Sequence, residues 1–432
     1  MAENYWTADQ KEEQLFTKFR LGLMGWTKTG REPSAGTQDV KYYLDLQEQR
    51  LKDHGLRVEL RLQPEEEIMS MQKFAANMPL FGGLTGRFQQ SLYAQTMDRH
   101  VRFTRAGKEV LEHKDSVNMY QTILQPDPED ENVGRTPYVC PNCGAVSTVE
   151  GLQEAGCPHC GTRYLMDELY PKTSNYYYVS TSGASTKHIN RKLRAVVVLG
   201  VISGILTTLY HLLWGAFAGG DFFILEPIVS LVLGTGLFCL LYYLIFAVTT
   251  LGRLFRDAFR ALPLMRATSG SKKSITQLLQ SYDPDFSYEY FEGRALSLAR
   301  ILMLCPDPRS CANYRGPDLR GRFDDVVDLQ YRGGMSIAGI DRRDRRIALD
   351  LKLYFTDTLD KGRKLKRKDE TVTISMYHDG DFPVDQGFSL VRVQCHGCGG
   401  SFDAARGRFC PYCGREYDAA RDDWVVTNIR RG

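Results

Sequence analysis

Eight of the eleven cysteines occur as four Cys-x-x-Cys pairs, and a glycine directly follows each pair. A glycine there lets the backbone turn so that amide groups point toward the sulfurs, and two such turns can present four thiolates in tetrahedral geometry. Because the pairs fall into two sets, each with a short insert, the spacing predicts two structural Zn²⁺ sites. The predicted ligands are Cys140, Cys143, Cys157 and Cys160 in the first set and Cys395, Cys398, Cys410 and Cys413 in the second.

A Cys-x-x-Cys pair could instead exchange thiols and disulfides, and both CPHC at 157–160 and CPYC at 410–413 have that form. A thioredoxin-type pair stands alone at a helix start in a βαβ unit, whereas each pair here has a second pair nearby. A disulfide framework is disfavoured in a reducing cytosol. A redox sensor stays as the weaker alternative. Cys239, Cys305 and Cys311 are interpreted as ordinary thiols.

The composition and motifs exclude several other functions. The formal net charge is +3, too small to attract the whole molecule to nucleic acid, and no nucleic-acid partner is expected. The sequence has no phosphate-cradling glycine loop, no HExxH and no serine–histidine pair in a recognisable context. Both predicted zinc sites have full ligand sets. The sequence therefore predicts no catalytic residue and no enzyme.

Two long apolar stretches, 195–218 and 222–248, follow one another with a short turn between them. The first has 24 residues, about 36 Å of helix, against a hydrocarbon core of about 30 Å. We therefore expect a hairpin that crosses a lipid bilayer. Basic residues flank both outer ends and the turn has none, so both termini should face the cytoplasm. These basic residues are Lys187, Arg191, Lys192, Arg194, Arg253, Arg256, Arg260 and Arg266.

The region after the hairpin predicts helices followed by antiparallel strands, which is an α+β domain. Ser287 is placed to cap a helix, with Phe286 and Phe291 in the positions of a hydrophobic staple. A short helix is expected over 323–331. Strict alternation predicts a strand over 347–355. Further strands are predicted in TVTISMYH, FSLVRVQC and the final DWVVTNI.

The stretch LLQSYDPDFSYEYFEG, the later strands and DWVVTNI resemble the Tim-forty-four-like domain, named after the tether of the mitochondrial import motor. The resemblance covers 270–432. It implies a cone similar to the nuclear-transport-factor-two-like fold, with a curved sheet wrapped by helices around an apolar pocket. With a membrane hairpin and no mitochondrial presequence, the chain is expected in the bacterial cytoplasmic (inner) membrane.

The predicted organisation has six parts, and the N-terminal α+β region is the least defined, with helices near 8–24 and 38–54. The segments before and after each cysteine set look alike, which suggests that both halves attach a zinc ribbon to a β-hairpin. A helix over 100–125 would exclude that hypothesis. The parts are the N-terminal region (1–136), ribbon 1 (137–170), a linker (171–192), the hairpin (193–250), an amphipathic linker helix (251–269) and the Tim-forty-four-like domain (270–432), with ribbon 2 (395–416) inserted before the last strand.

A basic run at 360–370 lies between two predicted strands, at a hairpin tip. The simpler interpretation of this run is a solvated turn. The functional interpretation is contact with anionic lipid headgroups. The resemblance favours lipid contact, because members of that family associate with acidic membranes. The cations are Lys361, Arg363, Lys364, Lys366, Arg367 and Lys368.

These observations favour a membrane-anchored binding or scaffold protein. Its cone domain would hold a protein, a peptide or an apolar ligand at the cytoplasmic face, in protein translocation or envelope maintenance. The alternative is an isomerase- or dehydratase-type enzyme, because the same cone fold hosts such activities. That alternative requires Asp, His or Tyr side chains that converge inside the pocket.

Overall fold

The computed structural model describes most of the chain outside the predicted membrane hairpin, and the described residues divide into two compact units. One unit contains Met1–Ser180 and Arg266–Gly432, and the other contains Thr181–Met265. The described ranges are 8–64, 84–85, 88–126, 132–180, 271–282, 286–343, 345–379 and 389–432, together with scattered residues between 198 and 252.

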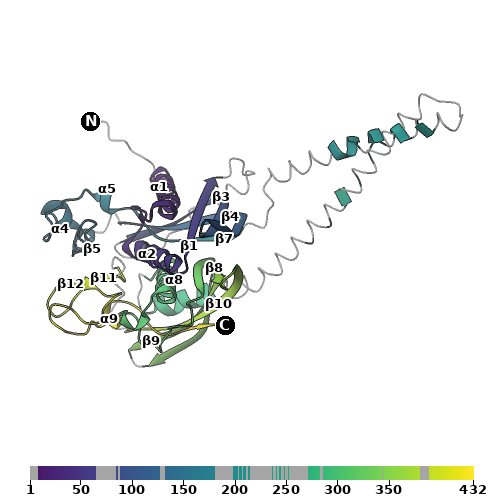
Figure 1. Cartoon of the computed structure of the whole chain (residues 1–432). Coiled ribbons are helices and arrows are strands. Elements are labelled where there is room, and N and C mark those ends of the chain that lie inside the picture. Colours follow the sequence, from purple (N-terminus) through teal and green to yellow (C-terminus); the bar gives the residue numbers. More distant parts are fainter. Residues whose placement is uncertain are drawn as a thin grey trace, which may run out of the picture. The chain divides into compact units, whose positions relative to one another are not determined.

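The N-terminal half of the first unit is two helices followed by an antiparallel sheet (Figure 1). The predicted helices near 8–24 and 38–54 are confirmed. Ala106 and Gly107 both have positive φ, as the tight turn between β3 and β4 requires. The sheet order is β1-β3-β4-β7, and β2 pairs with β3. The elements are α1 (Ala8–Thr29), α2 (Gln38–Asp53), β1 (Leu56–Pro64), β2 (Leu84–Thr85), β3 (Phe88–Arg105), β4 (Lys108–Pro126) and β7 (Lys172–Ser180).

The C-terminal half repeats this plan, with a helical segment at 271–280 and then α8 (Tyr288–Leu304). Ser287 caps α8 by accepting a hydrogen bond from the Tyr290 amide at 3.3 Å, and the Phe286 and Phe291 rings lie 5.7 Å apart, so the predicted cap and staple are confirmed. The antiparallel order β8-β9-β10-β13 follows the chain. These strands are β8 (Val326–Arg343), β9 (Arg346–Asp360), β10 (Leu365–Asp379) and β13 (Val425–Arg431).

Two predictions for this half are wrong. The expected helix over 323–331 is instead a turn at 323–325 followed by the start of β8, where Tyr331 pairs with Phe355 of β9. In the predicted strand over 388–395, of which the structure describes 389–395, β11 (Arg392–Gln394) is the part that forms a strand, and it pairs with β12 (Ser401–Asp403) and not with the main sheet. The strand that lies beside β13 is β10, which contains TVTISMYH.

Each cysteine-rich segment is inserted between two neighbouring strands of a sheet. Ribbon 1 lies between β4 and β7, and ribbon 2 lies between β10 and β13. Since the segment 100–125 is a strand pair and not a helix, the predicted repeat of a β-hairpin carrying a ribbon is confirmed. The short elements are η1 (Val133–Arg135), β5 (Pro137–Val139), β6 (Val146–Thr148), α4 (Val149–Glu154), α5 (Met166–Leu169), η2 (Pro308–Ser310) and α9 (Ala419–Asp422).

The two halves share one hydrophobic core. Phe16 and Phe19 of α1 belong to the same buried cluster as Phe291 of α8 and Phe355 of β9. Hydrogen bonds of buried arginines also cross between the halves, and they offset part of the cost of burying these charges. These bonds run from Arg50 to the Phe323 carbonyl (2.6 Å), from Arg294 to Asp39 (2.9 Å), and from Arg300 to Asn175 and the Tyr176 carbonyl (both 3.0 Å).

Most of the predicted membrane hairpin and of the linker helix over 251–269 lies outside the described residues. Within the described part of the chain, no helix combines the length and the apolar character needed to cross a membrane. The described residues between 198 and 248 are helical and many of their side chains are apolar and exposed, Leu206 (63%) and Trp214 (64%) among them.

Candidate metal centres and the adjoining cavity

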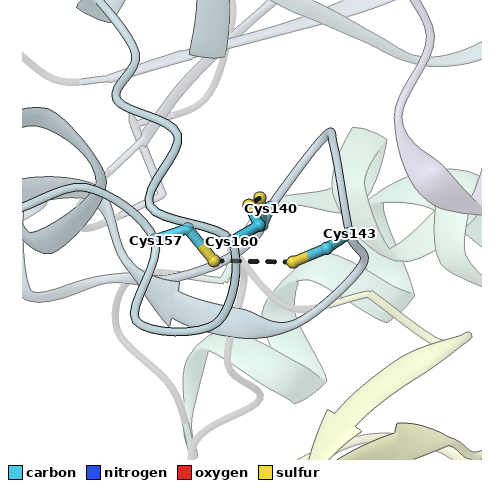
Figure 2. A group of neighbouring side chains, drawn as sticks. All are labelled: Cys140, Cys143, Cys157 and Cys160. Atoms are coloured by element: carbon cyan, nitrogen blue, oxygen red, sulfur yellow. Dashed lines mark hydrogen bonds between the residues drawn. The ribbon is translucent and has the colours of Figure 1, made fainter.

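The eight predicted ligands form two separate clusters, and each cluster unites the two pairs that the spacing assigned to it. Figure 2 shows the first cluster, in which the Sγ atoms of Cys140 and Cys160 lie 3.7 Å apart and those of Cys143 and Cys157 lie 3.5 Å apart. The second cluster has the same arrangement. Its Sγ distances are 3.6 Å for Cys395 and Cys413 and 3.7 Å for Cys398 and Cys410.

These distances match a four-coordinate metal centre. Zinc–sulfur bonds of about 2.3 Å at tetrahedral angles place sulfurs about 3.8 Å apart. A disulfide would bring two sulfurs to about 2.05 Å, and all eight cysteines are free thiols. In each cluster all ligand atoms lie within 4.8 Å of one another. Both clusters could therefore hold a metal ion with four sulfur ligands, which leaves no open position for a substrate.

Each pair is held by the same backbone turn. In the pair at 140–143, the Cys140 amide donates to the Ala145 carbonyl (2.8 Å), and the Gly144 amide donates to the Cys140 carbonyl (2.9 Å). Such a turn requires a left-handed residue after the second cysteine, and only glycine adopts that conformation without strain. The other three pairs repeat both bonds. The glycines have φ between 71° and 75° and are Gly144, Gly161, Gly399 and Gly414.

Hydrogen bonds favour the thiolate form of two sulfurs in the first cluster, Cys140 and Cys160, and of Cys395 in the second. The Thr162 hydroxyl lowers the pKa of Cys160 to about 6, and the Gly397 amide lowers the pKa of Cys395 to about 7. The second cluster cannot ionise fully by itself. Although the Gly400 amide lowers the pKa of Cys398, desolvation and the neighbouring sulfurs raise it to about 12. A divalent cation supplies the charge that would let all four sulfurs ionise.

The remaining described cysteines have a different environment. Cys305 and Cys311 are buried in the shared core, and burial raises the pKa of Cys311 to about 12. Such thiols are poor nucleophiles at neutral pH. Cys239 lies outside the described residues.

The two ribbons touch each other. The Val146 amide at the start of β6 donates to the Ser401 hydroxyl of β12 at 2.9 Å. The Arg392 guanidinium of β11 lies beside Gly144, and a Cβ added to that glycine would be 3.5 Å from Arg392 Nε. A shift of the backbone in one ribbon would therefore alter its contacts with the edge of the other ribbon.

A cavity of about 490 Å³ lies where ribbon 1 meets α2 and α8. Tyr138 and Tyr164 of ribbon 1 line one wall, and Tyr290 and Arg294 of α8 line another. No sequence pattern predicts this cavity, because its walls come from segments far apart in the chain. No motif connects them.

No protein-family model, no curated protein and no solved structure matches this chain. The resemblance to the Tim-forty-four-like domain therefore stays a prediction from sequence.

Proposed function

We propose that this protein is a membrane-anchored, zinc-containing binding or scaffold protein, with its Tim-forty-four-like domain facing the bacterial cytoplasm. The observation that carries the zinc assignment is the pair of four-cysteine clusters with sulfur separations of 3.5–3.7 Å. Zinc is the metal that tetrahedral sulfur ligand sets select among common cytoplasmic cations. In this proposal both ions are structural, because small ribbons have too little core to fold without metal.

The membrane anchor is supported by sequence and by exposure. Exposed leucines, Leu206, Leu209 and Leu240 among them, are 51–63% accessible in the segment between 198 and 248. Exposed apolar side chains of this kind are stable when lipid covers them. The basic residues outside both stretches favour cytoplasmic termini.

Lipid contact by the basic run is proposed for only part of that run. The run spans the tip between β9 and the start of β10, where Lys361 pairs with Asp325 (2.8 Å) and Lys368 pairs with Glu370 (2.7 Å). Arg367 is half-buried and donates to Gln330. Arg363, Lys364 and Lys366 remain exposed and form no ion pair within the described chain, so these three would meet anionic headgroups.

The test of the proposed function is the metal content of the chain purified from the membrane fraction of expressing cells. We expect about two zinc ions per chain, unchanged after mild oxidation of the sample. Chain recovered in the soluble fraction would contradict the anchor. Disulfides in place of metal would instead support the redox sensor.

Affinity capture from solubilised membranes, with and without residues 270–432, tests the binding role. Partners that depend on this region are expected under the proposal.

A further inference from the structure

The cavity beside ribbon 1 brings together three lysines from three elements. Lys18 comes from α1, Lys41 from α2 and Lys172 from the start of β7, and all three line the same space. Lys41 and Lys172 are half-buried and Lys18 is exposed. Partial burial of like charges costs free energy, so a structure that keeps three ammonium groups together gains most when an anion lies between them.

The charges around these lysines leave a positive excess. Lys172 donates to the Ser34 carbonyl (3.2 Å), and within the described chain none of the three lysines forms an ion pair. Most nearby carboxylates are engaged elsewhere: Asp39 with Arg294, Glu289 with Lys272, and Glu168 with the Leu165 amide. Exposed Asp167 lines the cavity, and Glu32 opposes the loss of the proton from Lys41.

Burial lowers the pKa values of two of these lysines, and neighbouring positive charges lower one of them further. Burial, followed by repulsion from Lys41 and Lys18, lowers the pKa of Lys172 to about 8. Burial also lowers the pKa of Lys41. A bound anion would reverse both effects, because it favours the charged form of each amine.

The rest of the cavity suits an organic group. Tyr138, Tyr164 and Tyr290 contribute aromatic side chains, and Val139 and Pro141 add apolar surface. A volume of about 490 Å³ lies in the range of small-molecule sites, which are mainly apolar with a few convergent polar groups. Three ammonium donors in the lining match a phosphate, which has several acceptor oxygens and a charge near −2.

We infer that this cavity binds a small phosphomonoester, with its phosphate among Lys18, Lys41 and Lys172 and its organic group against the tyrosines of ribbon 1 and α8. The inference rests on the proposed binding role and names the ligand class. The phosphomonoester is either a soluble compound or the headgroup of an anionic lipid such as phosphatidic acid.

Calorimetric titration of the full-length, zinc-loaded chain with phenyl phosphate tests the inference. The chain is held in phosphatidylcholine nanodiscs. We expect saturable binding to the wild type and no binding of phenol, which lacks the phosphate. Lys41→Gln and Lys172→Gln should each weaken binding about tenfold or more, because each removes a charge-assisted contact. Lys108→Gln is the matched control. Lys108 lies at the β3–β4 turn, outside the cavity lining, and its loss should leave binding unchanged.

A second set of nanodiscs containing phosphatidic acid separates the two sources of phosphate. If phosphatidic acid in the nanodiscs weakens the binding of phenyl phosphate, the site takes a lipid headgroup. If the binding of phenyl phosphate is unchanged, the site takes a soluble compound.

A protection measurement on the wild type does not depend on the folding of any variant. Phenyl phosphate should slow reductive methylation of Lys172 in the wild type and leave Lys108 unaffected. Absence of both binding and protection in the wild type overturns the inference, as does equal binding by all variants. With two zinc ions retained and the chain in the membrane fraction, that result would refute the ligand site and leave the proposed function standing.

Discussion

Single buried charges have strong effects in this protein. Arg294 of α8 is 6% exposed and contacts two carboxylates, Asp39 at 2.9 Å and Asp423 at 2.8 Å. Both acids come from distant parts of the chain, so one side chain links the N-terminal helices, α8 and the last strand. Burial still raises the pKa of Asp423 to about 6. The ion pairs therefore offset only part of the desolvation cost.

Glu292 gives a pH-dependent stability. It accepts a hydrogen bond from the Tyr331 hydroxyl, and burial, aided by Glu289, raises its pKa to about 7 from an ordinary value of 4.5. The folded state therefore holds this proton more tightly than the unfolded state. Its contribution to stability is complete below about pH 4.5 and is lost as the pH rises through about 7.

Replacing Glu292 with Gln should remove this component. We expect the free energy of unfolding of Glu292→Gln to fall less than that of the wild type between pH 5 and pH 8, as measured by urea unfolding in detergent. Burial also raises the pKa of Asp423 and, together with neighbouring Glu370, that of Asp357 in β9, but both groups are present in both proteins and their contributions cancel in the comparison. The control is exposed Glu416→Gln, which should follow the wild-type curve. Parallel curves for Glu292→Gln and the wild type would refute this assignment.

At this scale the sequence predicted the metal ligands and missed the lysine cavity. The cysteines could be grouped because their ligand pairs are local in sequence, with a glycine marking each turn. Lys18, Lys41 and Lys172 have no such signature. Only the packing of α1, α2 and β7 brings them together, and that packing depends on long-range contacts.

Among the elements, the four cysteine turns have the strictest backbone requirement. Gly414 has a φ of 71°, and a Cβ added there would meet no atom within 4 Å. A substitution at this position therefore tests backbone strain alone, without a steric clash.

We expect Gly414→Ala to cost about 1–2 kcal/mol, the strain of a left-handed alanine, and to weaken zinc retention at the second cluster about tenfold. Competition with a chromogenic chelator measures that retention. Gly25→Ala in α1 is the matched control, since it also has open space but a helical backbone, and it should stabilise the chain by about 0.5–1 kcal/mol. Equal zinc release from both variants would show that the turn does not need its glycine.

Strand prediction succeeded or failed according to how many faces of the strand are buried. In β9, Ile347, Leu349, Leu351, Leu353 and Phe355 are buried in alternation, as their pattern predicted. At the start of β8, adjacent Val326 and Val327 are both buried, each in a different hydrophobic cluster. A strand covered on both faces loses its alternation, and the apolar spacing over 323–331 then imitates a helix.

For the whole molecule, the shared core means that the N-terminal and C-terminal halves should not separate when the chain between them is cut. Arg50 of α2 donates to carbonyls of Phe323 and Val326, and Gln47 donates to Asp328. These contacts join segments more than 270 residues apart. Local sequence patterns do not indicate contacts between residues so far apart. The sequence analysis therefore placed the two halves in separate domains.

A site-specific protease sequence inserted between Gly219 and Gly220 tests this. After cleavage in detergent, nearly all of the C-terminal fragment should co-purify with a tag on the N-terminus, also at 1 M salt, because apolar burial holds the halves together. Denaturant should release it. Separation of the fragments without denaturant would mean that each half folds independently.

The two ribbons are embedded to different depths. Each ribbon packs two of its cysteines into a small cluster outside the shared core, and Leu124 of β4 joins the cluster of ribbon 1. Ribbon 2 also contributes to the shared core. Residues of that core are Ala405 within the ribbon, Leu390 before it and Trp424 after it. Evolution should consequently have had more freedom to shorten, lengthen or replace the first ribbon. Changes in the length or sequence of the second ribbon are restricted by its packing against the shared core.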